Sequence, residues 1–160
     1  SIVLIELMPV EIKVNFFSLN PLDYKLRNGM LKLMTFRTFP RTTGSDFSGE
    51  IVAKGESVNN FEIGEKVFGF LSQLNEGTSS QFIKVNQSIL SKAPSNIDIG
   101  KAAAVPLAAL TSYQALVQLA KIKKGNKVLI NGASGGTGIF AIQIAKIFGA
   151  KGFANMSVSK

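Results

Sequence analysis

The residue types and spacing most suited to chemistry lie between Lys127 and Phe148, where the sequence reads KVLINGASGGTGIFAIQIAKIF. A short apolar run leads into a glycine-rich turn, and a segment of helical period follows. Such an order opens a dinucleotide-binding unit, because backbone N–H groups at the helix start can bind a pyrophosphate. The alternative is a glycine-rich turn with a purely structural role. The predicted cofactor-binding residues of this phosphate loop are Ser134, Gly135, Gly136, Thr137 and Gly138.

The segments on either side of the turn are predicted to be buried. Val128–Ile130 is expected to form a buried strand, and Gly149 stands where a glycine commonly ends a helix. Gly138, which has no Cβ atom, would let helix and strand pack closely. The apolar residues that predict a largely buried helix are Ile139, Ile142, Ile144, Ala145 and Phe148.

The chain contains no histidine and no cysteine. This removes the two common zinc ligands, the usual general base and the thiolate nucleophile, so any catalysis must rely on a cofactor or on Lys, Tyr, Asn and carboxylate groups. We therefore expect no metal site. No apolar run approaches the roughly 20 residues that a membrane span needs, and the lack of cysteine is compatible with a reducing compartment. We expect a cytoplasmic protein with no membrane segment.

The net charge of +8 is unevenly distributed along the chain. Residues 1–98 hold ten basic and ten acidic side chains, whereas residues 99–160 hold eight lysines and no acidic side chain. All of the excess charge therefore lies on the segment that carries the phosphate loop. Either the acidic partners of this surface lie elsewhere, or the segment faces an anionic ligand or partner.

The pattern of elements changes near residue 98. Before it, short β-rich runs at 10–19, 49–54, 66–71, 78–85 and 89–93 alternate with glycine or asparagine turns, which predicts a small antiparallel barrel or sandwich. After it, Asp98 can cap a short helix, and Leu107–Ala120 is predicted to be a second helix. A strand at 128, a helix and a final strand at Gly152–Met156 complete the chain. We predict an α+β part followed by an α/β part.

Together these stretches resemble the medium-chain dehydrogenase/reductase superfamily, in its zinc-free, zeta-crystallin-like branch of quinone oxidoreductases and enone reductases. The resemblance implies a GroES-like catalytic domain over residues 1–105, truncated at its N-terminus. It also implies the start of a Rossmann NADPH-binding domain over residues 106–160, truncated at its C-terminus. We therefore expect a fragment of a longer enzyme. The motifs in family order are SLNPLDYKLRNG, GSDFSGEIVAKGE, FEIGEKVFGF, AAAVPLAALTSYQAL and KKGNKVLINGASGGTGIFAIQIAKIFGAK.

The resemblance also implies an activity. Members of this branch transfer hydride from NADPH to a quinone or to the C=C bond of an α,β-unsaturated carbonyl compound. By the same resemblance, the full-length protein is expected to form a homodimer. Two other readings stay open for this chain. It could be a non-catalytic relative that binds nucleic acid through its basic segment 121–160, although no RRM, KH or zinc-finger pattern is present. It could also be a truncated, inactive reading frame.

The motif match assigns roles to three residues of this sequence. Asn20 would lie at the edge of the nicotinamide, Lys25 would face the substrate carbonyl and Thr111 would lie near the nicotinamide. Each has a plainer alternative: an Asx turn before a proline for Asn20, a solvated helix lysine for Lys25 and a helix-surface hydroxyl for Thr111. Zinc-dependent relatives place a catalytic cysteine at the position of Asn20 and a His-Glu pair at Ser45-Asp46, so these residues cannot form that zinc site.

The choice of cofactor depends on the end of the second strand. NAD selectivity in this fold usually comes from an acidic residue about 20 positions past the glycine loop, and here that place falls at Met156–Ser157. With no carboxylate there, Ser157 or Ser159 could donate hydrogen bonds to a 2′-phosphate and Lys160 could pair with it, which predicts NADPH. The alternative is that SVSK is only a polar loop and that adenosine recognition lies elsewhere.

Overall fold

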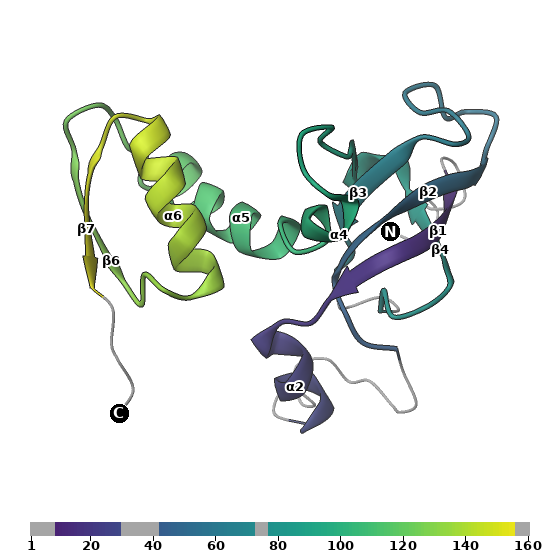
Figure 1. Cartoon of the computed structure of the whole chain (residues 1–160), viewed down its shortest axis with the longest axis horizontal. Helices are drawn as coiled ribbons and strands as arrows, with labels where there is room; N and C mark the ends of the chain where they lie inside the picture. The colour runs from purple at the N-terminus through teal and green to yellow at the C-terminus, as the bar shows by residue number, and fades with distance from the viewer. Residues whose placement is uncertain (1–8, 30–41, 73–76, 156–160) are drawn as a thin grey trace. The chain divides into compact units, whose positions relative to one another are not determined.

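The computed structural model describes residues 9–29, 42–72 and 77–155 (Figure 1). The chain divides into two compact units, Ser1–Pro106 and Leu107–Lys160. The first unit is rich in antiparallel strands, and the second combines helices with two parallel strands. The fold class predicted from the sequence, a GroES-like β-rich domain followed by part of a Rossmann domain, is confirmed.

The first unit contains one five-stranded antiparallel sheet among its described residues, in the order β4-β1-β2-β3-β5. The long strand β1 pairs with β2 on one side and with β4 on the other. The bounds of the strands are β1 Pro9–Ser18, β2 Asp46–Lys54, β3 Lys66–Phe70, β4 Phe82–Asn86 and β5 Leu90–Lys92.

Alternation of apolar and polar residues places the core on one face of this sheet. Val10 and Ile12 are fully buried, while Glu11 and Lys13, which follow them in turn, are exposed. Burying one such aliphatic side chain stabilises the fold by about 1.5–3 kcal/mol. The buried core comprises Val10, Ile12, Phe47, Ile51, Val58, Phe61, Val67, Leu71, Ile83, Val85 and Leu90.

Two strands begin three or more residues away from their predicted starts. β2 begins at Asp46 rather than at 49, because Asp46 to Glu50 pair with β3. β4 begins at Phe82 rather than at Thr78. Thr78 instead donates its N–H to the carbonyl of Gly44 and its hydroxyl to the carbonyl of Asp46, so it holds the start of β2 from outside the β4 ladder.

A close backbone approach joins β1 to β2 at Gly49. A Cβ atom at this position would lie 2.2 Å from the carbonyl oxygen of Lys13 and 2.8 Å from Cγ2 of Ile12. The register between the two strands shifts just beyond this point, between Val14 and Phe16. Only glycine fits here without displacing the backbone of the neighbouring strand.

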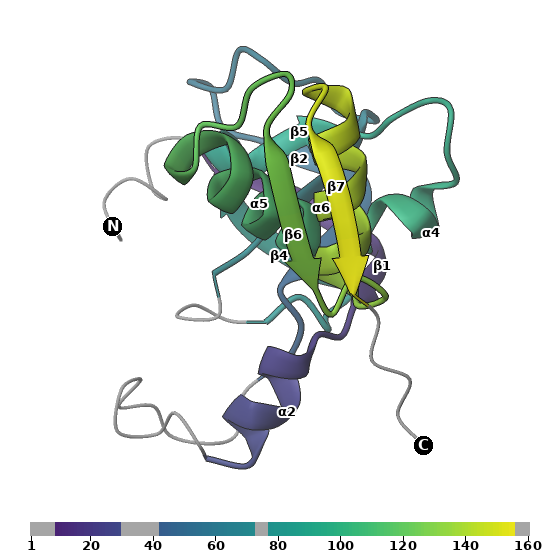
Figure 2. The same ribbon diagram turned by 90° about the vertical axis from the view of Figure 1, so that its left-hand side faces the viewer.

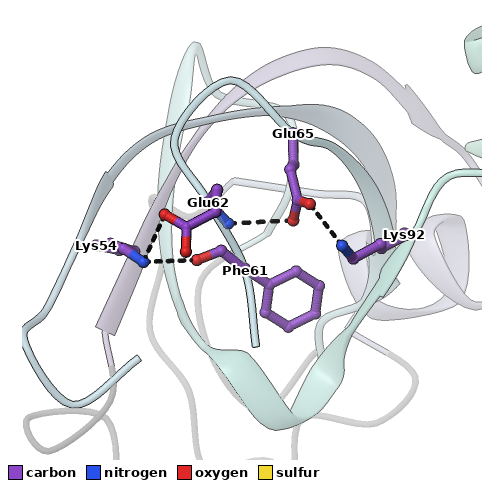
Figure 3. Close-up of polar contacts among 5 residues, drawn as sticks. All are labelled: Lys54, Phe61, Glu62, Glu65 and Lys92. Atoms are coloured by element: carbon purple, nitrogen blue, oxygen red, sulfur yellow. Dashed lines mark hydrogen bonds and ion pairs between the residues drawn. The ribbon is translucent and has the colours of Figure 1, made fainter. Parts of the chain in front are cut away.

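The turn before β3 is held by two lysine side chains (Figure 3). Lys54 Nζ lies 2.8 Å from the carbonyl oxygen of Phe61 and 2.8 Å from Oε2 of Glu62. The Glu65 carboxylate accepts hydrogen bonds from the N–H of Glu62 and from Lys92 of β5. These contacts fix the loop that directs the Phe61 side chain into the core.

Short helices complete the first unit. α2 (Pro21–Arg27) follows β1, and η1 (Gln87–Ile89), a 3₁₀ turn, links β4 to β5. α4 (Ile99–Ala102) begins at Asp98, whose carboxylate accepts a hydrogen bond from the N–H of Gly100 at 2.8 Å. The predicted cap at Asp98 is therefore confirmed.

The second unit is a βαβ arrangement preceded by a helix (Figure 2). β6 (Lys127–Asn131) and β7 (Lys151–Asn155) pair in parallel, and α6 (Gly136–Ile147) connects them. α6 lies against one face of this two-stranded sheet (Figures 1 and 2). Gly149 has φ +68° directly after the last turn of α6, which confirms the predicted glycine at the helix end.

The predicted burial of this region is only partly confirmed. Ile130 and Ala145 are buried and Val128 and Ile144 are half-buried, but the other predicted positions are exposed. Ile139 of α6 is 48% exposed, and Leu129 of β6 is 75% exposed. Side chains alternate across β6, so only Val128 and Ile130 can face α6 while Leu129 lies on the opposite face. A two-stranded sheet covers only a narrow strip of α6, which limits the buried residues of this cluster to Ile130, Ala133 and Ala141.

The helix predicted over Leu107–Ala120 changes its geometry half-way. α5 (Pro106–Tyr113) is α-helical, whereas Gln114–Leu119 forms a π-helix, η2, with the N–H of Ala120 bonded to the carbonyl of Ala115. Such widened turns are rare. No sequence signal predicts it, because α-helix and π-helix require the same residue types.

Replacing Gly49 by alanine should destabilise the first unit. The new Cβ would force the β1 backbone to move, and overpacking of this kind costs about 1–3 kcal/mol. Gly152→Ala in β7 is the matched control, since a Cβ there meets no atom within 4 Å. Urea unfolding measures both free energies. Equal stability of the Gly49→Ala variant and the wild type would contradict the close approach.

Acid should weaken the contact between β3 and β5 through Glu65. Hydrogen bonds from Lys92 and from the N–H of Glu62 hold the pKa of the Glu65 carboxyl below its ordinary value of 4.5. Because the folded pKa is the lower one, this stabilisation is complete above the ordinary value and is lost as the pH falls through the folded pKa.

Lys92→Met should therefore reduce the loss of stability between about pH 7 and about pH 3, measured by urea unfolding. Lys84→Met, which removes an exposed lysine of β4 with no ion pair among the described residues, is the control. An identical pH dependence in the wild type and the Lys92→Met variant would show that this ion pair contributes nothing.

Candidate functional site

Asn20 lies at the junction of β1 and α2, where its side chain bonds to a buried carboxylate. Its Nδ2 donates to Oδ2 of Asp46 at 2.8 Å and lies 3.3 Å from the hydroxyl of Ser18. The Ser18 hydroxyl donates to the same Asp46 oxygen at 2.7 Å. A carboxylate accepts only, so the amide nitrogen of Asn20 must face Asp46. The amide oxygen faces the backbone N–H of Asp23 in a capping box. With two lone pairs it can accept one further hydrogen bond, from a ligand, and it cannot donate.

A second buried carboxylate, Asp23, fixes the start of α2. It accepts hydrogen bonds from the N–H of Asn20 at 2.6 Å and from the N–H of Gly44 at 2.7 Å. Bonds from N–H donors to a carboxylate are stronger than neutral ones. Asp23 was not among the predicted site residues, although an acidic residue three positions after an N-cap asparagine is the spacing of a capping box.

Two buried hydroxyl residues, Ser45 and Thr78, lie next to Asp46, one along the chain and the other through a hydrogen bond to its backbone carbonyl. Ser45, Asp46 and Thr78 are all buried, and the Ser45 hydroxyl has no hydrogen-bond partner among the described residues. Ser45 and Asp46 are the positions at which zinc-dependent relatives were expected to carry His and Glu. Among residues 9–29, 42–72 and 77–155, no group of three or more His, Cys, Asp or Glu side chains could hold a metal ion.

Lys25 lies on α2, about one and a half turns beyond Asn20. Its side chain is half-buried, on the same strip of the helix as Leu22, three residues earlier. Within the described part of the chain it forms no hydrogen bond or ion pair. The ammonium group is therefore available to a ligand, and its predicted role in the reaction stays a prediction.

In the second unit, the glycine loop begins α6 without a side-chain cap. Gly135 is the N-cap residue, and the first intrahelical bond runs from the N–H of Ile139 to the Gly135 carbonyl. The N–H groups of Gly136, Thr137 and Gly138 therefore have no acceptor among the described residues. Three adjacent N–H donors at a positive helix end can bind an anion.

The loop is both accessible and rigidly placed. Ser134 to Thr137 are exposed, whereas Gly138 is buried. A Cβ atom on Gly138 would lie 2.5 Å from the carbonyl oxygen of Gly132 and 2.6 Å from Cα of Ala133. The start of α6 thus touches the end of β6 through backbone atoms, as predicted for a glycine at this place.

Neighbouring hydroxyls on α5 differ in their contacts. Thr111 is exposed and donates to the carbonyl of Leu107 in its own helix at 2.7 Å. Ser112 is buried, and its hydroxyl lies 2.7 Å from the carbonyl oxygen of Thr137 at the start of α6. Sequence reasoning missed Ser112; the available signal was a hydroxyl four residues after a small apolar residue, Ala108, on a helix.

Three further sequence-based expectations concern the 2′-phosphate contacts, Thr111 and a membrane segment. Ser157, Ser159 and Lys160 lie outside the described residues. The predicted role of Thr111 near a nicotinamide stays a prediction, since its hydroxyl is bonded within α5. No helix in the described parts of the chain is long and apolar enough to cross a membrane.

Comparison with known proteins shows which family these two units represent. Residues 8–95 match the alcohol dehydrogenase GroES-like domain. The chain is 37% identical over 141 residues to a chloroplastic quinone-oxidoreductase homolog of Spinacia oleracea, covering 85% of this chain and 43% of the relative. It is 35% identical over 157 residues to a mitochondrial NAD(P)H oxidoreductase of Mus musculus, covering 88% and 40% respectively.

A solved structure supports the same assignment. The crystal structure of CurK enoyl reductase matches with a TM-score of 0.85 at 35% identity, covering 93% of this chain and 46% of that chain. The chain therefore spans less than half the length of these relatives. Because the GroES-like match alone takes up more than half of the 160 residues, the chain belongs to the medium-chain dehydrogenase/reductase superfamily, as a relative of its quinone oxidoreductases.

Proposed function

We propose that the whole protein is an oxidoreductase that uses a nicotinamide dinucleotide to reduce a quinone or the C=C bond of an α,β-unsaturated carbonyl compound. The observation that carries this proposal is the uncapped start of α6, with three N–H donors that have no acceptor among the described residues. The names of the spinach, mouse and CurK relatives support it.

The residues of the loop fit a pyrophosphate. Ser134 to Thr137 are exposed to an incoming ligand, and Gly138 keeps the helix start close to β6. The N–H groups of Gly136, Thr137 and Gly138 would hold the pyrophosphate, with the helix dipole favouring its charge. The dinucleotide, when bound, supplies the hydride. The chain then contributes orientation and electrostatic stabilisation.

In the first unit, we assign roles to Asn20 and Lys25. The amide of Asn20 is held by Asp46, so it would meet the nicotinamide edge with its oxygen and accept a hydrogen bond there. The free ammonium of Lys25 would stabilise the negative charge that develops on the substrate carbonyl oxygen during reduction. Neither role requires a metal, and we propose a zinc-independent reaction.

The remaining assignments follow from the family. We propose that residues 1–105 belong to the GroES-like catalytic domain and residues 106–160 to the start of the Rossmann domain, in a protein that forms homodimers. The cytoplasmic location stays a prediction, because the spinach and mouse relatives are named chloroplastic and mitochondrial. Nucleic-acid binding through residues 121–160 is not proposed, since no contact among the described residues favours it.

Lys25→Met should lower kcat for an enone substrate by about tenfold or more in the whole protein, because one electrostatic stabiliser of the transition state is lost. Lys101→Met on α4, which removes an exposed lysine outside the proposed site, is the control and should leave kcat unchanged. Steady-state kinetics at saturating cofactor measures both. An unchanged kcat in the Lys25→Met variant would contradict the proposed role and show that Lys25 is only a solvated helix lysine.

The protein should prefer NADPH to NADH. No acidic side chain occurs between Asp98 and Lys160, so a 2′-phosphate near Ser157 and Lys160 would meet no repelling carboxylate from this segment. The ratio of kcat/KM for NADPH to kcat/KM for NADH should fall in the Lys160→Glu variant. Lys151→Glu, with the same charge change at the start of β7, should leave the ratio unchanged. A wild-type preference for NADH would show that this loop does not receive a 2′-phosphate.

A further inference from the structure

We propose that Ser112 is a positioning residue for the phosphate loop, an inference that rests on the dinucleotide binding proposed above. Ser112 lies on α5, outside the loop, and its side chain is 1% exposed. Its hydroxyl lies 2.9 Å from the carbonyl oxygen of Ala108 and 2.7 Å from that of Thr137. The single hydroxyl hydrogen is shared between these two acceptors.

The two contacts of Ser112 differ in what they connect: one lies within α5 and the other joins α5 to α6. The contact with Ala108 is the ordinary bond of a helical serine to the carbonyl four residues earlier, and Thr111 makes the same bond to Leu107. The contact with Thr137 spans 25 residues and joins α5 to the first turn of α6. Only this second bond links Ser112 to the loop.

The peptide geometry at Thr137 shows why this bond matters. The carbonyl of Thr137 and the N–H of Gly138 belong to one planar peptide group, so a bond that holds the oxygen also fixes the direction of the N–H. That N–H is one of the three donors proposed to bind the pyrophosphate. A hydrogen bond to the carbonyl also polarises the peptide group and strengthens its N–H as a donor.

Packing around Ser112 supports the same role. Ala108, Ser112 and Leu116 lie four residues apart, on one strip that continues from α5 into η2. A Cβ atom on Gly136 would lie 3.8 Å from Cβ of Ala108, so this strip lies directly behind the start of α6. Leu116 packs against the cluster of Ile130, Ala133 and Ala141.

The test is ligand binding to Ser112→Ala, measured by calorimetry with NADPH, NADH and inorganic pyrophosphate as probes. Loss of the hydrogen bond from Ser112 to the Thr137 carbonyl should raise the Kd for each probe by about three- to tenfold. Ser48→Ala is the matched control: the buried Ser48 hydroxyl donates to the carbonyl of Ile99, the first residue of α4, also at 2.7 Å. It should leave the Kd values unchanged.

The possible outcomes distinguish a failure of this inference from a failure of the proposed function. If the wild type binds none of the three probes, the proposed function fails. If the wild type binds them and Ser112→Ala binds equally well, or if Ser48→Ala weakens binding to the same extent, the positioning role is overturned. With pyrophosphate bound, faster hydrogen exchange at the Gly138 amide of Ser112→Ala than of the wild type would support it. Should Ser112→Ala not fold, Ser112→Cys, a weaker donor of similar shape, gives the same comparison.

Discussion

The buried carboxylate of Asp46 is the constraint on which the arrangement of the first unit depends. A charge removed from water must be met by donors, and here the Ser18 hydroxyl and the Asn20 amide meet one of its oxygens. These donors come from the end of β1 and the start of α2. The junction between that strand and that helix must therefore lie next to Asp46, the first residue of β2. Thr78 adds a bond to the Asp46 backbone carbonyl. The orientation of Asn20 is a consequence of this network.

Close approach of backbones is the second constraint, and it acts in both units. Gly49 lets β2 lie against the carbonyl of Lys13, and Gly138 lets α6 begin against Gly132 and Ala133. Neither contact tolerates a Cβ atom, because the atoms that it would meet are backbone atoms that cannot rotate away. Close contacts of this kind place the candidate functional groups more firmly than side-chain packing alone.

The two candidate sites share one principle of organisation. The groups proposed to contact ligand are the Asn20 amide and the N–H of Gly138. A buried residue holds each of them, Asp46 in one unit and Ser112 in the other. Such preorganisation is what makes hydrogen-bond donors and acceptors effective in binding and catalysis, because they need not reorient when the ligand arrives.

The sequence by itself determined the elements and the family: the glycine turn at 132–138, the cap at Asp98, the alternation at Val10 and Ile12, and the motifs of an oxidoreductase. These are local patterns, and local backbone preferences suffice to read them. The roles of Asp46 and Ser112, the exposure of Leu129 and Ile139, and the π-helical turn after Tyr113 were decided only by the tertiary structure. Each depends on which residues distant in sequence come together, and neither periodicity nor composition contains that information.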